Sequence, residues 1–124
     1  MRDAIVIVLI FIFVISGSIF SSNFYNEMYK DFSEKLDVLA ATIEKDVNKE
    51  EKVKEIEDLW KEKEKLLIVF QDHSLVGDIE ENLYECFQYY RYNEKDHFDA
   101  MKDKVLMEIE DLIKREAFSI VNIL

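Results

Sequence analysis

The sequence predicts an all-α protein in which an N-terminal transmembrane helix is followed by an antiparallel bundle of about four helices. The chain of 124 residues contains no proline and only two glycines, which leaves few residues suited to hairpins or long loops. Residues 4–20 contain no ionisable side chain, and thirteen of these seventeen residues are Ile, Val, Leu or Phe. Beyond them, apolar residues recur three or four positions apart, which is the spacing of one helix face.

The first apolar stretch predicts a membrane anchor, or uncleaved signal, over residues 1–25, followed by an extracytoplasmic helical domain over residues 26–124. As a helix, residues 4–20 reach about 26 Å, slightly less than a hydrocarbon core of about 30 Å. Phe24 and Tyr25 extend the predicted span and place aromatic rings at the membrane interface, where they are favoured. The chain is thus expected to contact membrane lipid through this anchor.

Cleavage of the same stretch as a secretory signal is the alternative. Ser16 and Ser18 are small residues at the spacing of a cleavage site, and cleavage would release a secreted helical protein. Against cleavage, Asp3 offsets the charge of Arg2, so the positively charged start of a signal peptide is weak. We therefore favour the anchor.

Charge counting sets the expected orientation of the anchor. Arg2 and the α-amino group are the positive charges before the span, and Lys30 is the first one after it. This places the N-terminus in the cytoplasm and the domain outside, in a single-pass protein of the cell membrane. Two small-xxx-small spacings could join two anchors into a homodimer, although such spacings often arise by chance: Gly17 with Ser21, and Ser18 with Ser22.

The net charge of the chain is −11, and it belongs to the predicted domain, because Arg2 and Asp3 cancel. An acidic domain is repelled by nucleic acid and by anionic lipid, so no nucleic-acid partner is expected. Cys86 is the single cysteine, which excludes an intramolecular disulfide and a metal site built from several thiolates.

The domain begins with two helical patterns. The first could continue directly from the span, and its apolar face consists of Met28, Phe32, Leu36, Leu39, Ile43 and Val47. Asn48 and Glu51 form a capping pair that predicts the start of the second helix. Its apolar face consists of Val53, Ile56, Leu59, Trp60, Leu67 and Phe70. We expect Trp60 to be a structural residue of the core.

Two further helical patterns follow a connection predicted at residues 72–78, where His73 is expected to be a structural residue that bonds a backbone group. Asp78 with Glu81 is predicted to open the third helix, whose apolar residues are Val76 on the lead-in, Ile79, Leu83, Cys86, Phe87 and Tyr90. Asn93 with Asp96 is predicted to open the fourth, whose apolar residues are Phe98, Met101, Val105, Ile109 and Leu112. The apolar tail, residues 116–124, is expected to pack on the bundle.

Several features together resemble a known family: Trp60, the Asp72-His73 turn, Ile79, Leu83, Tyr90, Ala100 and the closing Asn122-Ile123-Leu124. The chain is similar over its whole length to the domain of unknown function 4363, a family of small membrane-anchored helical proteins of endospore-forming Gram-positive bacteria. It departs from them in having one tryptophan, where a second aromatic residue of that kind is expected upstream. The resemblance implies a layout and a location and brings no established activity.

No arrangement of residues in the sequence predicts catalysis, so no catalytic, cofactor-binding or metal-binding residue is assigned and no enzyme activity is expected. His73, Cys86 and His97 could be drawn as zinc ligands, but they lack the close spacing of a structural zinc site. Cys86 also falls on the apolar face of the third helix, where a free cysteine is usually a small core residue.

The strongest candidate for a partner surface lies on the third helix. Tyrosine is enriched in interfaces, and three tyrosines of this helix lie off its apolar face. They lie in or beside the stretch between Lys65 and Arg91, which contains acidic but no basic residues. The predicted partner surface comprises Tyr84, Tyr89, Tyr92, Asp78, Glu81 and Glu85. Tyrosines also rim small cores with their hydroxyls in water, and acids suit a solvated helix start, so both features have an ordinary structural explanation.

We therefore predict a non-catalytic, membrane-anchored extracytoplasmic helical interaction module of uncharacterised role, whose partner is another membrane protein. The alternatives are a secreted helical protein left after signal cleavage and a cation-binding domain.

Overall fold

The structure, a computed structural model, describes residues 1–45 and 48–123, and within helices it leaves the side chains of Ser18, Ser21, Ser22, Phe70 and residues 116–123 undescribed. The described ranges contain four helices and no strand: α1 (Arg2–Thr42), α2 (Lys49–Phe70), α3 (His73–Arg91) and α4 (Lys95–Ile123). The all-α prediction is confirmed. The small-xxx-small pairs and the apolar tail fall on undescribed side chains, and so does Phe70, while Val47 lies outside the described residues altogether.

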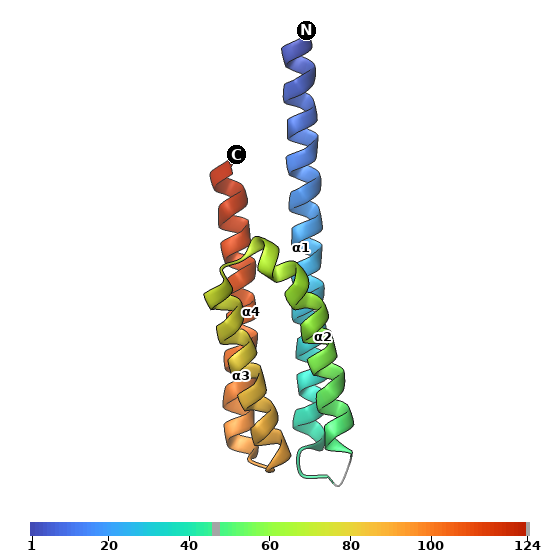
Figure 1. Cartoon of the computed structure of the whole chain (residues 1–124), viewed down its shortest axis with the longest axis vertical. Helices are drawn as coiled ribbons and strands as arrows, with labels where there is room; N and C mark the ends of the chain where they lie inside the picture. Colours follow the sequence, from blue (N-terminus) through green and yellow to red (C-terminus); the bar gives the residue numbers. More distant parts are fainter. Residues whose placement is uncertain (46–47, 124) are drawn as a thin grey trace.

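The four helices form an antiparallel bundle in which each helix packs beside the next one in the chain, and α4 returns to pack beside α1 (Figure 1). Contact is most extensive between α3 and α4 and between α1 and α4, and it is less extensive between α1 and α2. The N-terminal part of α1 continues past the ends of the other helices (Figure 1). The α2–α3 connection lies at the same end of the bundle as this projecting segment, and the other two connections lie at the opposite end (Figure 1).

The core is built from the helix faces that the apolar spacing predicts. In α1 and at its C-cap, Ile43, the five described residues of the predicted face are each at most 1% exposed: Met28, Phe32, Leu36, Leu39 and Ile43. Trp60 of α2 is fully buried, and its ring packs edge-on against Phe32 with ring centroids 6.1 Å apart. Trp60 is therefore a core residue, as the sequence predicts. The predicted faces of α3 and α4 are also buried, apart from half-buried Met101.

The start of α2 follows the predicted capping pair. Asn48 is the N-cap, and its side-chain oxygen accepts a hydrogen bond from the backbone N–H of Glu51 at 3.3 Å. The Glu51 carboxylate in turn accepts from the Asn48 side-chain amide, also at 3.3 Å. Two polar groups at an exposed helix end therefore satisfy each other.

The start of α3 corrects the sequence prediction. The helix begins at His73 rather than near Asp78, because the Asp72 carboxylate accepts a hydrogen bond from the Ser74 N–H at 2.7 Å and caps it there. Gly77 lies inside the helix. The earlier start brings Val76 into the helix and onto its buried face.

The α3–α4 connection corrects a second prediction. Asn93 was expected to open the fourth helix, but it follows the end of α3 in the left-handed conformation, with φ of 57°. Asparagine tolerates this conformation better than most residues. The first hydrogen bond of α4 instead runs from the Phe98 N–H to the Glu94 carbonyl, at 2.9 Å.

Phe24 and Tyr25 belong to the bundle and not to the end of the predicted span. Tyr25 is 3% exposed, and its hydroxyl accepts a hydrogen bond from the Gln71 side chain at 2.8 Å. Phe24 packs partly buried against the core, and the Lys63 ammonium lies 5.4 Å from its ring centroid. Both rings therefore pack with the bundle, although both residues precede the predicted start of the helical domain at residue 26. The neighbours that hold them are Lys63 of α2 for Phe24 and Gln71 of the α2–α3 connection for Tyr25.

In the part of the chain that the structure describes, none of the helices has an apolar stretch long enough to cross a membrane. The transmembrane span stays a prediction.

Candidate functional site

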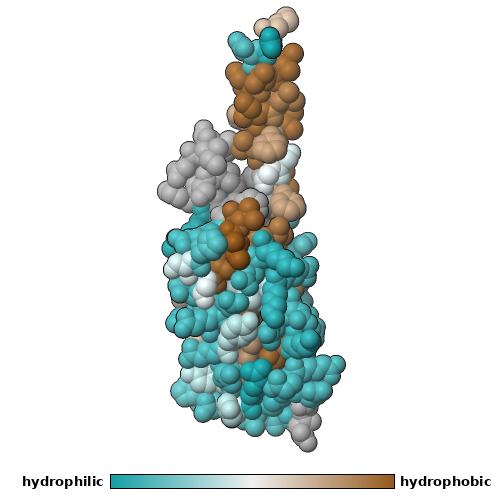
Figure 2. Space-filling view, viewed as in Figure 1, coloured by the Kyte–Doolittle hydropathy of each residue, from teal (hydrophilic) through white to brown (hydrophobic). Residues whose placement is uncertain are grey.

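The first candidate site is the projecting part of α1, which is apolar on every side. Its large apolar residues from Ile5 to Phe13, together with Ile15, Ile19 and Phe20, are each between 47% and 80% exposed. Because these residues are nearly consecutive, they cover the whole circumference of the helix rather than one face. Figure 2 shows this segment as an apolar column standing beyond a hydrophilic bundle. A surface of this kind marks a contact with lipid or with another protein.

A second exposed apolar area lies at the end of α2 and was not singled out from the sequence. Leu66 and Ile68 are 43% and 38% exposed and Val69 is 70% exposed, whereas Leu67 between them is buried. Figure 2 shows an apolar area on the bundle at its end nearest the projecting segment. The signal in the sequence is the run Leu66 to Phe70, since five consecutive apolar residues exceed what one helix face can bury.

The tyrosines of the predicted partner surface point to different neighbours. Tyr84 is 37% exposed and packs edge-on against Phe87, with ring centroids 6.0 Å apart. Its surroundings are on the α2 side: partial burial, then the nearby charges of Glu80 and Glu57, raise the pKa of its phenol.

Tyr89 lies on the α4 side of the same helix. Its hydroxyl donates a hydrogen bond to the Glu85 carboxylate at 3.0 Å, and its ring stacks on His97 with centroids 5.1 Å apart. The bond to Glu85, more than burial, raises the pKa of the Tyr89 phenol. Tyr92 follows the end of the helix and is 74% exposed. The structure thus brings Tyr89 and Glu85 together and directs Tyr84 to the opposite side of α3.

The acids of this surface are solvated, and a neighbouring one is structural. Asp78, Glu81 and Glu85 are exposed. Glu80 instead accepts a hydrogen bond from the indole N–H of Trp60, at 3.3 Å, and so satisfies the polar group of a buried ring. Burial and then the charge of Glu80 raise the pKa of Glu64 on α2.

The histidines and the cysteine do not form a common site in the structure. His73 is exposed at the first position of α3, and the side chain that caps the backbone there is that of Asp72. His97 stacks on Tyr89. Cys86 is fully buried, and burial raises the pKa of its thiol to about 12. Among the described residues, no three His, Cys, Asp or Glu side chains are placed to hold a metal ion.

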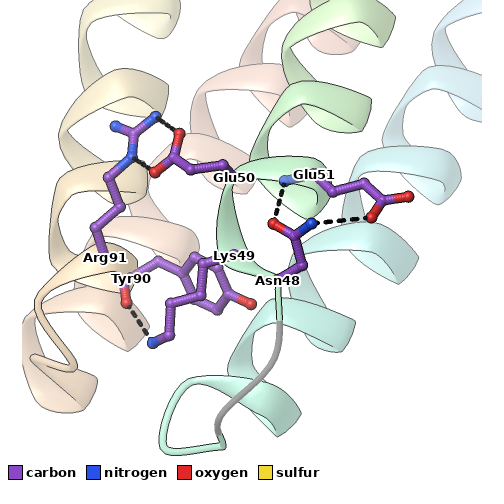
Figure 3. A network of polar contacts seen from close by, with 6 residues as sticks. All are labelled: Asn48, Lys49, Glu50, Glu51, Tyr90 and Arg91. Carbon is purple, nitrogen blue, oxygen red and sulfur yellow. Dashed lines mark hydrogen bonds and ion pairs between the residues drawn. The ribbon is translucent and has the colours of Figure 1, made fainter.

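A polar network joins the ends of α1, α2 and α3 at the end of the bundle away from the projecting part of α1 (Figure 3). The Lys49 ammonium donates to the Tyr90 carbonyl at 2.9 Å, to the Ile43 carbonyl and to the Asn93 side-chain oxygen. Its three protons therefore meet three acceptors at the C-terminal ends of α1 and α3, where the helix dipoles favour a cation.

The same network includes an ion pair beside Lys49 (Figure 3). Arg91 binds both carboxylate oxygens of Glu50, at 2.7 and 3.3 Å, and the hydrogen bond lowers the pKa of Glu50. Sequence reasoning missed the role of Lys49 because its acceptors lie up to 44 residues away. The network ties α1, α2 and α3 together and is structural.

A groove of about 280 Å³ lies between α1 and α2. The Lys35–Glu55 ion pair, at 2.6 Å, borders it together with exposed Val38 and with Lys52. A groove crossed by its own ion pair offers little to a small ligand.

Comparison with known proteins identifies a family. The model of a family described as a domain of unknown function (DUF4363) matches residues 19–123, which covers the bundle and leaves most of the apolar column outside the match. Neither a search of curated proteins nor a search of solved structures found a match.

Proposed function

Since this chain belongs to the DUF4363 family, a domain of unknown function, we propose its role from its own residues: a non-catalytic, membrane-anchored module that holds a helical bundle outside the cytoplasm for a protein partner. The observation that carries the proposal is the apolar column of residues 4–20, exposed on all sides and continuous with a bundle helix. A helix that is apolar all round is stable in lipid or in a large protein core, and this bundle provides no such core.

The energetics of the column favour lipid. Its thirteen Ile, Val, Leu and Phe residues each contribute roughly −0.3 to −0.6 kcal/mol at the centre of an inserting helix, or about −4 to −8 kcal/mol together. With Phe24 and Tyr25 in the bundle, the column of residues 4–20 is about 26 Å long. A bilayer thins locally to accommodate a short helix at a modest cost in free energy.

The continuity of α1 bears on how the bundle is presented. α1 extends without interruption from Arg2 to Thr42. An anchor that is one helix with the bundle fixes the tilt and distance of the bundle relative to the membrane, whereas a glycine-rich linker would not. The module we propose therefore presents one defined set of faces to other membrane proteins, at the high effective concentration that anchoring provides.

The partner face that we propose is the exposed part of α3. Tyr92 is an exposed aromatic side chain, and Asp78, Glu81 and Glu85 are exposed acids on the same helix. Aromatic anchors in a negative field suit a basic or amphipathic segment of another protein. Tyr89 is held by Glu85 and His97, which makes it a pre-ordered part of such a face.

The proposal assigns no catalytic role to the chain. The single thiol is buried and protonated at neutral pH, and His97 is stacked on a tyrosine. The thiol is therefore not available as a nucleophile.

Membrane fractionation with protease treatment tests the anchor. The full chain expressed in bacteria should stay with membranes after an alkaline carbonate wash. Its measured mass should include residues 4–20. Protease added outside intact, wall-stripped cells should digest its domain. A mature N-terminus near Ile19 would establish the secreted alternative. A domain protected from external protease would reverse the orientation.

Crosslinking in native membranes tests the partner face. Wild-type chain should capture a membrane protein, and a Tyr92→Ser, Tyr89→Ser double variant should lose it while keeping its helical content. A variant carrying Tyr29→Ser, half-buried on α1, controls for the loss of a tyrosine ring away from α3. Equal capture by wild type and double variant would place the interface elsewhere, and capture of a second copy alone would indicate a homodimer.

A further inference from the structure

We propose that the end of α2, through Leu66, Ile68 and Val69, is a second membrane contact, which enters the lipid surface beside the anchor. The inference rests on the proposed function, in which residues 4–20 lie in the bilayer. It adds a contact that decides how closely the bundle sits on the membrane.

The first supporting observation is the concentration of exposed apolar side chains at this point. Apart from Met1 and the apolar column, seven of the described large hydrophobic side chains are exposed: Val38, Leu66, Ile68, Val69, Tyr84, Tyr92 and Met107. Three of the seven fall within four consecutive residues, and Val69 is the most exposed aliphatic among them, at 70%. Leu67 already fills the core position of this turn. The other three side chains remain partly exposed, and Val69 is largely exposed.

The second observation is the position of this cluster relative to the anchor. The Lys63 ammonium lies over the Phe24 ring, and the Gln71 side chain bonds the Tyr25 hydroxyl. Lys63 precedes residues 66–69 in the chain and Gln71 follows them. The two contacts therefore place residues 66–69 near Phe24 and Tyr25, where the bundle part of α1 begins. Phe20, the last residue of the apolar column, is four residues from Phe24, which is about 6 Å along a helix.

The distance fits a shallow membrane contact. Interfacial helices bury their apolar faces about 5–10 Å into the boundary between headgroups and acyl chains. If residues 4–20 occupy the hydrocarbon core, the cluster lies within about 6 Å of its edge and therefore in this boundary. The projecting segment and the α2–α3 connection occupy the same end of the molecule (Figure 1).

Charge favours a lipid surface without requiring an anionic one. Lys63 and Lys65 precede the cluster on α2, but Glu62 and Glu64 alternate with them. The charges of residues 62–65 cancel, and Asp72 adds one negative charge after the cluster, whereas the chain as a whole carries −11. The contact should therefore depend on buried apolar area and only weakly on anionic lipid.

Fluorescence quenching in vesicles tests the contact with two matched variants of the full chain. In Val69→Trp the new indole replaces an exposed side chain of the cluster, and in Val38→Trp it replaces one that is 49% exposed on α1 far from the apolar column. Both variants keep Trp60, which is buried and gives the same background. Each protein is reconstituted into phosphatidylcholine vesicles in which the lipid carries bromine on its acyl chains.

We expect severalfold stronger quenching for Val69→Trp than for Val38→Trp, and the same result when phosphatidylserine is added. Equal, weak quenching in proteins that do float with vesicles would overturn the second contact and leave the anchor intact. Failure of both variants, and of wild type, to float with vesicles would overturn the anchor and with it this inference. Crosslinking of Val69→Trp to a second copy without quenching would assign the cluster to a protein interface instead.

Discussion

The two halves of α1 show how one uninterrupted helix can be built for two environments. Between Ile5 and Phe20 its apolar side chains surround the axis and are exposed. Between Tyr25 and Ile43 its apolar residues recur three or four positions apart, and those on this stripe are buried. Backbone hydrogen bonding is the same in both halves, so it does not distinguish them. What differs is the number of faces that need an apolar neighbour, which is one in the bundle half and all of them in the projecting half.

The largest effect on stability should come from removing the Trp60 ring, which packs against the bundle half of α1. Trp60→Ala deletes the ring that packs edge-on against Phe32 and leaves Glu80 without the indole donor. We expect a loss of about 3–5 kcal/mol in the free energy of unfolding. Urea unfolding of the detergent-solubilised chain measures it, and membrane association of the folded fraction should not change. A loss below about 1 kcal/mol would show that the core does not depend on this ring.

The next effect should be confined to the projecting half. Ile10→Asp places a charge at the middle of the apolar column and should cost about 3 kcal/mol of insertion free energy, with Ile10→Leu as the matched control. Ile10 is exposed, so the bundle should keep its helical content. Carbonate washing of membranes measures the shift of the variant into the wash. If Ile10→Asp stays in membranes as well as Ile10→Leu does, the column is not embedded.

A smaller effect is expected at the far end of α1, where Lys49 binds the Ile43 and Tyr90 carbonyls. Lys49→Met keeps most of the side-chain volume and removes the cation from two helix C-termini. We expect a loss of about 1–2 kcal/mol in the free energy of unfolding. Lys54→Met, at an exposed position of α2, is the control and should change stability by less than about 0.5 kcal/mol. Equal effects of the two variants would show that the network contributes nothing specific.

The smallest effect concerns the ion pair between the bundle half of α1 and α4. Lys102 donates to Asp37 at 3.0 Å. Burial lowers the pKa of Lys102, but the hydrogen bond and charge of Asp37, together with the charges of Asp103 and Asp99, outweigh it and leave the pKa above its ordinary value of 10.5. A raised lysine pKa contributes stability that is present below the unfolded value and is lost as pH rises through the folded one.

Asp37→Asn should therefore cost about 0.2–1 kcal/mol at neutral pH, with a smaller cost in high salt. The difference from wild type should disappear above pH 10.5, as Lys102 loses its proton. Thermal unfolding of both proteins across this pH range checks the result, with Asp58→Asn on α2 as control. A difference that persists in alkali would mean that Asp37 acts through something other than the Lys102 charge.

The sequence was sufficient for the helices and most of the core, because both follow from local spacing. A residue such as Phe32, Ile79 or Val105 lies on a stripe that only one face of a helix can bury, so its place follows from its neighbours in the chain. The cap at Asn48 was predictable for the same reason, since it involves residues three positions apart. The start of α3 was missed because two local caps compete, Asp72 and Asp78, and burial of Val76 favours the earlier one.

What the sequence by itself determined is the contrast within α1, since an unbroken apolar run and a periodic one differ in composition and spacing alone. Tertiary structure decided where the one ends and the other begins: Tyr25 is a bundle residue because Gln71, 46 positions away, bonds its hydroxyl. It also separated Tyr84 from Tyr89 and gave Lys49 its three acceptors. Each of these depends on which helices become neighbours, and long-range contacts of single side chains leave no periodic trace in a sequence.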